Sequence, residues 1–219
     1  MITLGIETST PMCSVALAVD QDVRLRRQLA PRGHAQLILP WIEELLAECE
    51  LSYADIDRLA VGQGPGGFTS LRIGLGIAQG ISLAHELPVT PVSSLSALAF
   101  SAGASANGEP IVALMDARMG EVFVGWFEFD RSGFKVLSTE AVMRPEQVQL
   151  SSDRSWRAVG SGLAAYPEIF RSALGNQIIS WRPQAYPVAE AILELAAVTE
   201  PVPAWKLEPN YVRDQVTQG

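Results

Sequence analysis

The first fifty residues of the chain contain short apolar runs, one run that alternates apolar and polar positions, and one apolar stripe with helical spacing. Residues 2–8 and 13–19 are mostly apolar, which predicts two buried strands. Residues 23–30 alternate apolar and charged positions, which predicts a third strand with one solvated face. An apolar stripe with glutamates on the opposite side then predicts an amphipathic helix. The stripe consists of Leu37, Ile38, Trp41, Ile42, Leu45, Leu46 and Cys49.

The pattern of the first half returns in the second. A strand at 57–62, a helix ending near His85, a fifth strand and a short helix complete the first half. Residues 101–110 are rich in Gly, Ser and Ala and indicate a linker. Three strands followed by alternating strands and helices come again after it, including a last helix near 188–198. The sequence therefore predicts an α/β protein of the two-lobed actin/hexokinase/Hsp70-like (ASKHA) class, with lobes at 1–105 and 106–219, each a mixed sheet with helices.

Seven glycines fall within VGQGPGGFTSLRIGLGIAQG, residues 61–80. Gly62, Gly64 and Gly67 satisfy G-x-G-x-x-G between a strand and a helix. However, the motif does not follow the first strand of a β-α-β unit, and no acidic residue ends the next strand. A P-loop is excluded because the G-K-[ST] ending is absent. These exclusions argue against a dinucleotide or triphosphate cradle in this loop.

The helix that follows this loop contains glycine at three interior positions. Each helical glycine costs about 1 kcal/mol relative to alanine, so some contact should offset Gly74, Gly76 and Gly80. Gly76, Gly80 and Ala84 share one face, and small residues at that spacing let another helix approach closely. The face either packs on the chain's own sheet or contacts another subunit.

Polar residues at the first turn of each half are the candidates for phosphate or metal chemistry. Glu7, Thr8, Ser9 and Thr10 belong to the first half, and Asp116 and Arg118 to the second. They either hold Mg²⁺ through water near a phosphate or simply close local turns. No glycine lies between Glu7 and Ser14, which argues against tight triphosphate binding by this chain alone. His34 and His85 have no nucleophile or metal-ligand motif around them and are expected to cap helices or lie at the surface.

Charge and composition exclude several classes of protein. The net charge is −8, the pI is about 4.8 and no run of Lys or Arg occurs, so direct gripping of nucleic acid is disfavoured. Cys13 and Cys49 lie far apart among apolar residues, which predicts free buried thiols. The amino-terminal residues lack the features of a signal peptide, and no segment has the length and hydropathy of a membrane span. We therefore expect a reduced, cytoplasmic protein.

The segment GPGGFTSLRIG, residues 64–74, resembles the G-P-G-S-F-T-G-L-R-I-G signature of the TsaB (YeaZ) family. The similarity extends to LGIETST, RGHAQLILPWIEELL, DARMGEVFVGWF and the closing PNYVR. Gly67 and Ser70 depart from the signature, which usually has serine and glycine there. Ser70 is expected to cap the helix. If the glycine that is usual at this position has a positive φ, Ser70 requires a local conformation different from that of the family.

The resemblance implies a non-catalytic subunit required for N6-threonylcarbamoyladenosine at position 37 of tRNA. Such a subunit binds and activates its paralogue TsaD, acts with the P-loop ATPase TsaE, and forms a homodimer in isolation. TsaD carries an H-x-x-x-H metal pair, whereas the corresponding PVSSLSALAF here has no histidine. No tightly bound cofactor and no metal are expected for this chain alone, which leaves the complex interface as the place for any ATP or ADP. The acidic charge further suggests that tRNA is contacted only indirectly.

Family resemblance places the partner interface on the helices of the first lobe. The implied residues are Phe68, Thr69, Leu71, Arg72, Ile73, Gly76, Ile77 and Gly80, together with Leu37, Trp41 and Leu45. The alternative is a stand-alone ATP-dependent small-molecule kinase of the same fold, which would need glycine-containing phosphate loops and a catalytic aspartate. A protease, a label attached to relatives, would need a nucleophile–base pair or a metal site.

Overall fold

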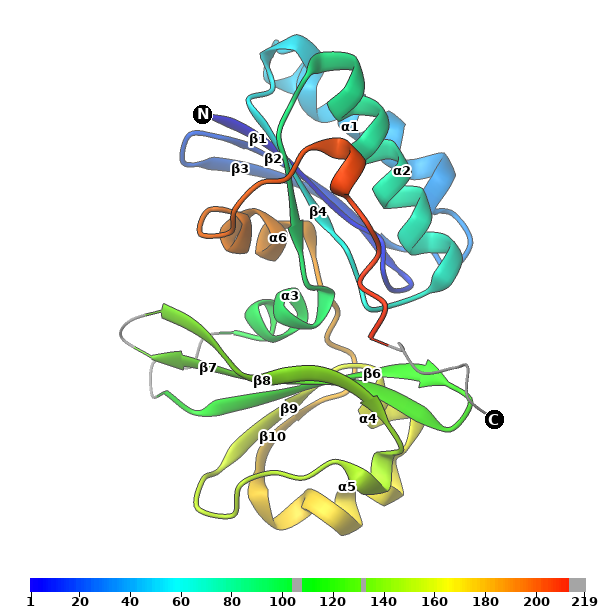
Figure 1. Ribbon diagram of the computed structural model, residues 1–219, viewed down its shortest axis with the longest axis vertical. Coiled ribbons are helices and arrows are strands. Elements are labelled where there is room, and N and C mark those ends of the chain that lie inside the picture. Colours follow the sequence, from blue (N-terminus) through cyan, green and yellow to red (C-terminus); the bar gives the residue numbers. More distant parts are fainter. Residues whose placement is uncertain (104–107, 131–132, 213–219) are drawn as a thin grey trace. The chain divides into compact units, whose positions relative to one another are not determined.

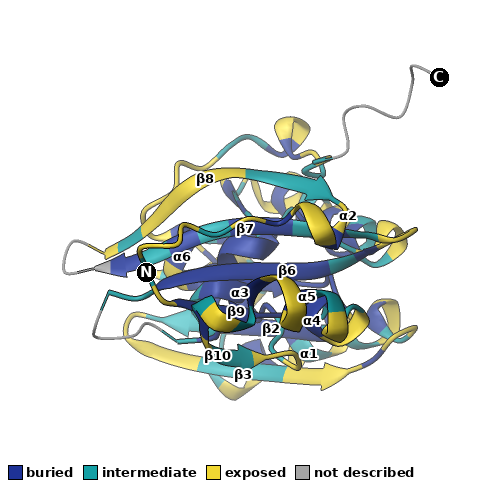
Figure 2. Ribbon diagram, turned by 90° about the horizontal axis from the view of Figure 1, so that it is seen from below, coloured by how far each residue is buried: buried dark blue, intermediate teal, exposed yellow. Residues whose placement is uncertain are grey.

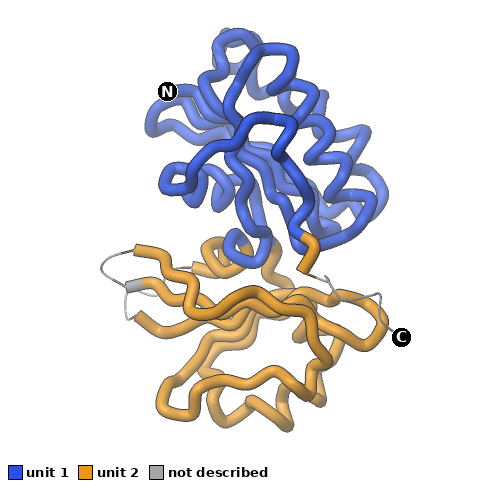
Figure 3. Tube along the Cα trace, viewed as in Figure 1, with its two compact units in different colours: residues 1–97, 187–210 blue, residues 98–186, 211–219 orange. Residues whose placement is uncertain are grey.

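The computed structural model describes residues 1–103, 108–130 and 133–212. The predicted lobe boundary at 105/106, part of the predicted linker and Arg213 of the PNYVR segment lie outside the described residues. The chain divides into two compact units, coloured separately in Figure 3. Unit 1 comprises residues 1–97 and 187–210, and unit 2 comprises residues 98–186 and 211–219.

The sheet of unit 1 has five strands in the order β3-β2-β1-β4-β5. Antiparallel pairing joins β1 to β2 and β2 to β3, whereas β4 runs parallel to both β1 and β5. Short turns suit the antiparallel part, and the parallel part needs helical crossovers. The bounds are Ile2–Glu7 (β1), Met12–Val19 (β2), Asp22–Leu29 (β3), Arg58–Gly62 (β4) and Val89–Val92 (β5).

Helices cover both faces of this sheet (Figure 1). Leu4 and Ile6 of β1 belong to the apolar core that contains residues of α1 (His34–Glu48) and α2 (Phe68–His85). Successive side chains of a strand point to opposite faces, so Gly5 faces the other way, toward Leu193 of α6 (Ala189–Ala196). A Cβ at Gly5 would lie 3.0 Å from the Ala189 carbonyl oxygen, so glycine there allows the close approach of α6.

The position of α6 corrects the predicted division at 105/106. The last helix was predicted in the second lobe, but residues 187–210 belong to unit 1. The backbone N–H of Ala189 donates to Ser14 Oγ on β2 at 2.9 Å, and the apolar face of α6 is buried. A continuous range of 106–219 therefore does not describe the second unit, because the chain returns to fill the open face of the first sheet.

Unit 2 repeats the strand order of unit 1. Its sheet has the order β10-β9-β6-β7-β8. When the strands are numbered by their place in each repeat, both sheets have the order 3-2-1-4-5, read from β3 in unit 1 and from β8 in unit 2. The predicted topological repeat is thus confirmed. Figure 2 shows the buried β6 and the largely exposed β8 of this sheet. The bounds are Pro110–Arg118 (β6), Glu121–Asp130 (β7), Gly133–Met143 (β8), Trp156–Val159 (β9) and Ile178–Arg182 (β10).

The short helices differ in detail from the sequence pattern. One helix was predicted at 163–171, but α4 (Gly162–Ala165) ends at Tyr166 and α5 (Pro167–Leu174) begins at the following proline. The residue before a proline is disfavoured in helical conformation, which explains the break. The remaining helix is α3 (Ser94–Ser101), and the 3₁₀ turns are η1 (Tyr53–Asp55), η2 (Pro145–Gln147), η3 (Gly175–Gln177) and η4 (Ala204–Lys206).

Candidate functional site

The glycine-rich stretch forms a tight turn between β4 and α2. Gly64 has φ of 98°, a conformation that side chains rarely adopt. Gly67 precedes the helix with φ of −63°, and its N–H donates to the Ser9 carbonyl oxygen at 2.7 Å. The expectation that Ser70 caps the helix is wrong. Ser70 lies within α2, and its Oγ donates to the Gly67 carbonyl oxygen at 3.3 Å.

Two glycines of this turn and one of α2 make room for the polar residues at the end of β1. A Cβ at Gly62 would overlap the Glu7 carboxylate, and one at Gly66 would overlap the Ser9 backbone. A Cβ at Gly74, inside α2, would overlap Thr8 Oγ1. These contacts explain three of the seven glycines by close packing within unit 1.

Glu7 links the turn to the start of α3. It is fully buried, and its carboxylate accepts hydrogen bonds from Ser9 N–H at 2.6 Å and Ser94 Oγ at 2.9 Å. Ser94 Oγ also accepts from Gly64 N–H at 3.2 Å. Burial raises the pKa of Glu7 above its ordinary value, although the bonds from Ser9 and Ser94 oppose this shift.

The candidate phosphate residues of unit 1 are buried in this conformation. Thr8, Ser9 and Thr10 are all less than a tenth exposed. Thr8 Oγ1 and Ser9 Oγ have no hydrogen-bond partner within the described part of the chain. His34 was expected to cap a helix or lie at the surface, and it does neither. It is buried at the start of α1, with Nε2 2.9 Å from the Thr10 carbonyl oxygen.

The candidates of unit 2 close the turn between β6 and β7. Asp116 Oδ1 accepts from Arg118 N–H at 2.9 Å, and its Oδ2 lies 3.1 Å from Arg118 Nη1. Ser161 Oγ accepts from Asp116 N–H at 3.1 Å. Both candidate residues thus have local partners, as the turn-closing alternative predicted.

The exposed side of α2 is smooth in its middle and apolar at both ends. Gly76 and Gly80 are exposed, and a Cβ at either would meet no atom of the described residues within 4 Å. They therefore do not pack on the chain's own sheet. Phe68 is 70% exposed at the start of the helix, and Leu83 is 66% exposed near its end. Figure 1 shows α2 lying beside α1 on one side of the sheet.

Arg72 extends the surface formed by Phe68. Its guanidinium lies 3.4 Å from the centroid of the Phe68 ring, and Nη1 donates to the Phe68 carbonyl oxygen at 2.9 Å. This cation–π contact brings the two side chains together at the first turn of α2. Together they offer a flat surface with positive charge at one edge.

The predicted interface residues differ in how much surface they offer. Leu71 and Leu45 are buried in the core of unit 1, so neither is available for contact in this conformation. Those that remain at least partly exposed are Phe68, Thr69, Arg72, Ile73, Gly76, Ile77 and Gly80 of α2, and Leu37 and Trp41 of α1. Some of these partly exposed residues also pack against the core of unit 1, namely Leu37, Trp41, Ile73 and Ile77. Whether they bind a partner stays a prediction.

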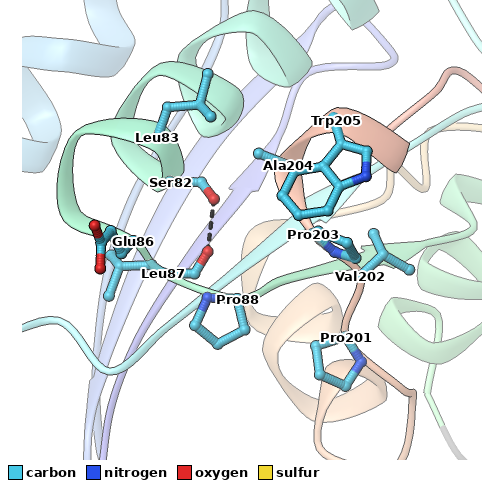
Figure 4. A pocket seen from close by; sticks show the side chains of 10 residues that line it. All are labelled: Ser82, Leu83, Glu86, Leu87, Pro88, Pro201, Val202, Pro203, Ala204 and Trp205. Atoms are coloured by element: carbon cyan, nitrogen blue, oxygen red, sulfur yellow. Dashed lines mark hydrogen bonds between the residues drawn. The ribbon is translucent and has the colours of Figure 1, made fainter.

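Sequence analysis missed a pocket of about 470 Å³ at the carboxyl end of α2 (Figure 4). One wall comes from the end of the helix and the residues after it, and the other from residues 201–205. The tail from residue 199 was predicted to be irregular. Its association with unit 1 depends on a long-range pairing, Val89 with Val202, that no local pattern reveals.

Two further features bear on the classes of protein considered. Among the described residues, no three His, Cys, Asp or Glu side chains lie together as a metal site would require. No helix within that part of the chain has the length and hydropathy needed to cross a membrane.

Cys13 is buried while Cys49 is partly exposed, and burial together with nearby Glu7 raises the pKa of the Cys13 thiol to about 12.

Residues 27–202 match the model of a protein family described as TsaD, tRNA N6-adenosine threonylcarbamoyltransferase. The chain is 38% identical to the tRNA threonylcarbamoyladenosine biosynthesis protein TsaB of Escherichia coli K12, over 99% of this chain and 96% of that protein. It is 40% identical to the Haemophilus influenzae TsaB, over 98% and 94% of the two chains.

Solved structures show the same relationship. A Pseudomonas aeruginosa protein described as similar to peptidase YEAZ has a TM-score of 0.88 and 33% identity, covering 97% of this chain and 99% of its own. YeaZ from the same organism has a TM-score of 0.85 and 32% identity, covering 96% and 99%. The predicted actin/hexokinase/Hsp70-like class is therefore confirmed together with its repeated sheets. Similarity over almost the whole sequence, the shared fold and the glycine turn before α2 establish that the chain belongs to the TsaB (YeaZ) family.

Proposed function

We propose that this protein is a non-catalytic subunit needed for N6-threonylcarbamoyladenosine formation in tRNA, and that α2 docks it onto a TsaD-type transferase. The relatives that cover nearly its whole length are named as threonylcarbamoyladenosine biosynthesis proteins. The task of this chain is then assembly, in which the docked subunit holds its partner in the active form.

The observation that carries this proposal is the open space above Gly76 and Gly80. Other glycines of the stretch are explained by contacts inside unit 1, whereas a Cβ on these two would meet nothing within 4 Å in the part of the chain that the structure describes. Each costs the free helix about 1 kcal/mol relative to alanine. A second helix that packs against the glycines would use the close approach they allow and offset this cost.

The proposed contact surface includes the glycines in the middle of α2 and the side chains at its amino-terminal end. Phe68 and Arg72 are in contact at one end, and aromatic and arginine side chains that become buried often dominate interface energies. The partly exposed apolar residues of α1 and α2 widen the surface. Without the partner, the same face is available to a second copy of the chain, which gives the proposed homodimer.

A non-catalytic role fits the chemistry at the end of β1. Glu7, Thr8 and Ser9 are buried against glycines, so a phosphate would have to displace the packing that forms the turn. We therefore propose that this chain alone holds no nucleotide tightly, and that ATP or ADP belongs to the complex. The alternative, an ATP-dependent small-molecule kinase, requires these residues to be accessible.

The remaining partners follow from charge and family. A chain with a net charge of −8 is poorly suited to grip tRNA directly, so we assign the main tRNA contacts to the partner subunits. The P-loop ATPase TsaE is proposed as the third component. Size-exclusion chromatography of this chain with and without a TsaD-type partner, and with and without ATP, tests the assembly. A shared peak supports it, and separate elution of the two proteins both with and without ATP contradicts it.

A further inference from the structure

The pocket at the carboxyl end of α2 has walls fixed by hydrogen bonds. Val89 and Val202 pair through their backbones, with N–H to carbonyl distances of 3.1 and 2.7 Å. Gln79 Nε2 donates to the carbonyl oxygens of Ala204 and Leu207 at 3.2 and 3.0 Å. The tail is thereby attached to both β5 and α2, which makes the pocket a preformed feature of unit 1.

The surface of the pocket is mainly apolar and includes a large exposed aromatic ring. Trp205 is 76% exposed although its neighbour Ala204 is buried, because the η4 turn presents the indole outward. Figure 4 shows Trp205 and Leu83 on opposite walls, and both walls contain proline. Proline restricts the backbone of these walls, so binding there would order little of this chain. An exposed tryptophan on a rigid wall has the character of an interface anchor.

The charge at the rim is negative. Of the lining residues, all within the described part of the chain, only Glu86 is ionisable. It is exposed and follows the last turn of α2, where the helix dipole adds partial negative charge. Glu200 and Lys206, one acidic and one basic, flank the other wall in sequence. A ligand with a cationic group beside an apolar one is favoured by the Glu86 carboxylate, by the carboxyl end of α2 and by the face of the Trp205 ring.

We propose that this pocket binds a short segment of a partner protein that presents a bulky apolar side chain close to a lysine or arginine. The apolar side chain enters between Leu83 and the Trp205 wall, and the basic group lies at Glu86. This site goes beyond the proposed helix contact, because its recognition elements are the tail and the end of α2 rather than the glycine face.

Selection of short random peptides displayed on phage against the full-length chain tests this site directly. The enriched peptides should share an apolar residue with a neighbouring Lys or Arg. The best peptide is then synthesised and titrated by fluorescence anisotropy. Trp205→Ala and Glu86→Lys should each weaken its binding by about tenfold or more. Val198→Ala, an exposed apolar control in unit 1 outside the pocket, should leave binding unchanged.

The same peptide separates this proposal from the docking of α2. Gly76→Arg should retain wild-type affinity for the peptide, even if it abolishes binding to a TsaD-type partner. Circular dichroism of each variant establishes that the fold is intact. Absence of any enriched peptide, equal affinity for Trp205→Ala, or a preference for acidic peptides would overturn the proposal.

Discussion

Gly74 in the second turn of α2 lies against Thr8 at the end of β1, so that a Cβ on Gly74 would overlap Thr8 Oγ1. The glycine is inside a helix that it weakens, yet the contact brings α2 close to the strand. The same helix continues to Gly76 and Gly80, where an added Cβ would meet none of the residues that the structure describes within 4 Å. One helix therefore contains glycines of two kinds, and substitution distinguishes them.

Gly74→Ala should destabilise the protein by about 1–3 kcal/mol, the usual cost of overpacking a tight contact. The loss should exceed the gain in helix propensity of about 1 kcal/mol. Chemical denaturation monitored by circular dichroism measures the free energy of unfolding. The double variant Gly74→Ala with Thr8→Ala should recover part of that loss, because the clashing hydroxyl is gone. Additive effects of the two changes would refute the contact.

Gly76→Ala and Gly80→Ala should each stabilise the isolated protein by about 1 kcal/mol. Both residues are helical, and a Cβ at either would meet nothing within 4 Å, so only the gain in helix propensity remains. Thermal and denaturant unfolding of the single variants measures the effect. Destabilisation by either change would mean that the exposed face of α2 is already in use within the chain.

Glu7 should make the stability of the protein depend on pH. Burial raises the pKa of its carboxyl in the folded state above the ordinary value of 4.5. The resulting contribution is fully present below pH 4.5 and is lost as pH rises through the folded-state pKa. Ionisable groups elsewhere add their own dependence, so the comparison must be with Glu7→Gln.

Glu7→Gln keeps the shape of the side chain and removes its ionisation. Its amide oxygen can accept from Ser9 N–H, and its amide nitrogen can donate to Ser94 Oγ. Denaturant unfolding at a series of pH values from about 4.5 upward should show a smaller loss of stability for the variant than for the wild type. Parallel curves would show that Glu7 does not carry the predicted titration.

Much of the fold could be predicted from local pattern, because alternation and helical spacing report which faces are buried. The strands of unit 1 and the helix after the glycine turn appear close to their predicted places. The return of α6 to unit 1 could not be predicted, because α6 meets a sheet more than a hundred residues earlier in the sequence. Gly5 was the local signal for this approach, but a glycine in a strand has several explanations.

The candidate site could be predicted only in part. Gly76 and Gly80 were correctly identified as a smooth face, since their spacing of four places them on one side of a helix. Leu71 and Leu45 were named with them but are buried, because the boundary between the core stripe and the exposed face cannot be fixed from spacing alone. The reason for Gly62, Gly66 and Gly74 required the three-dimensional contacts with residues 7–9.

Phe68→Ala should weaken binding to a TsaD-type partner while leaving the free energy of unfolding nearly unchanged. The ring is 70% exposed and touches Arg72 rather than the core, so its removal leaves no cavity in the isolated protein. An interface aromatic of this kind typically costs about 2 kcal/mol or more when truncated. Isothermal titration calorimetry measures the affinity, with Ile179→Ala, an exposed apolar residue of unit 2, as the control. Equal losses for both variants would contradict a specific role for Phe68.

The proposed docking through α2 is tested most directly by the affinity of Gly76→Arg for a TsaD-type partner, measured by isothermal titration calorimetry. The matched control is Gly175→Arg, a helical glycine of unit 2 whose Cβ would also meet nothing within 4 Å. Both variants should fold, because arginine has space at each position and a better helix propensity than glycine. The account predicts that Gly76→Arg abolishes binding and that Gly175→Arg retains wild-type affinity. Wild-type affinity of Gly76→Arg would contradict it.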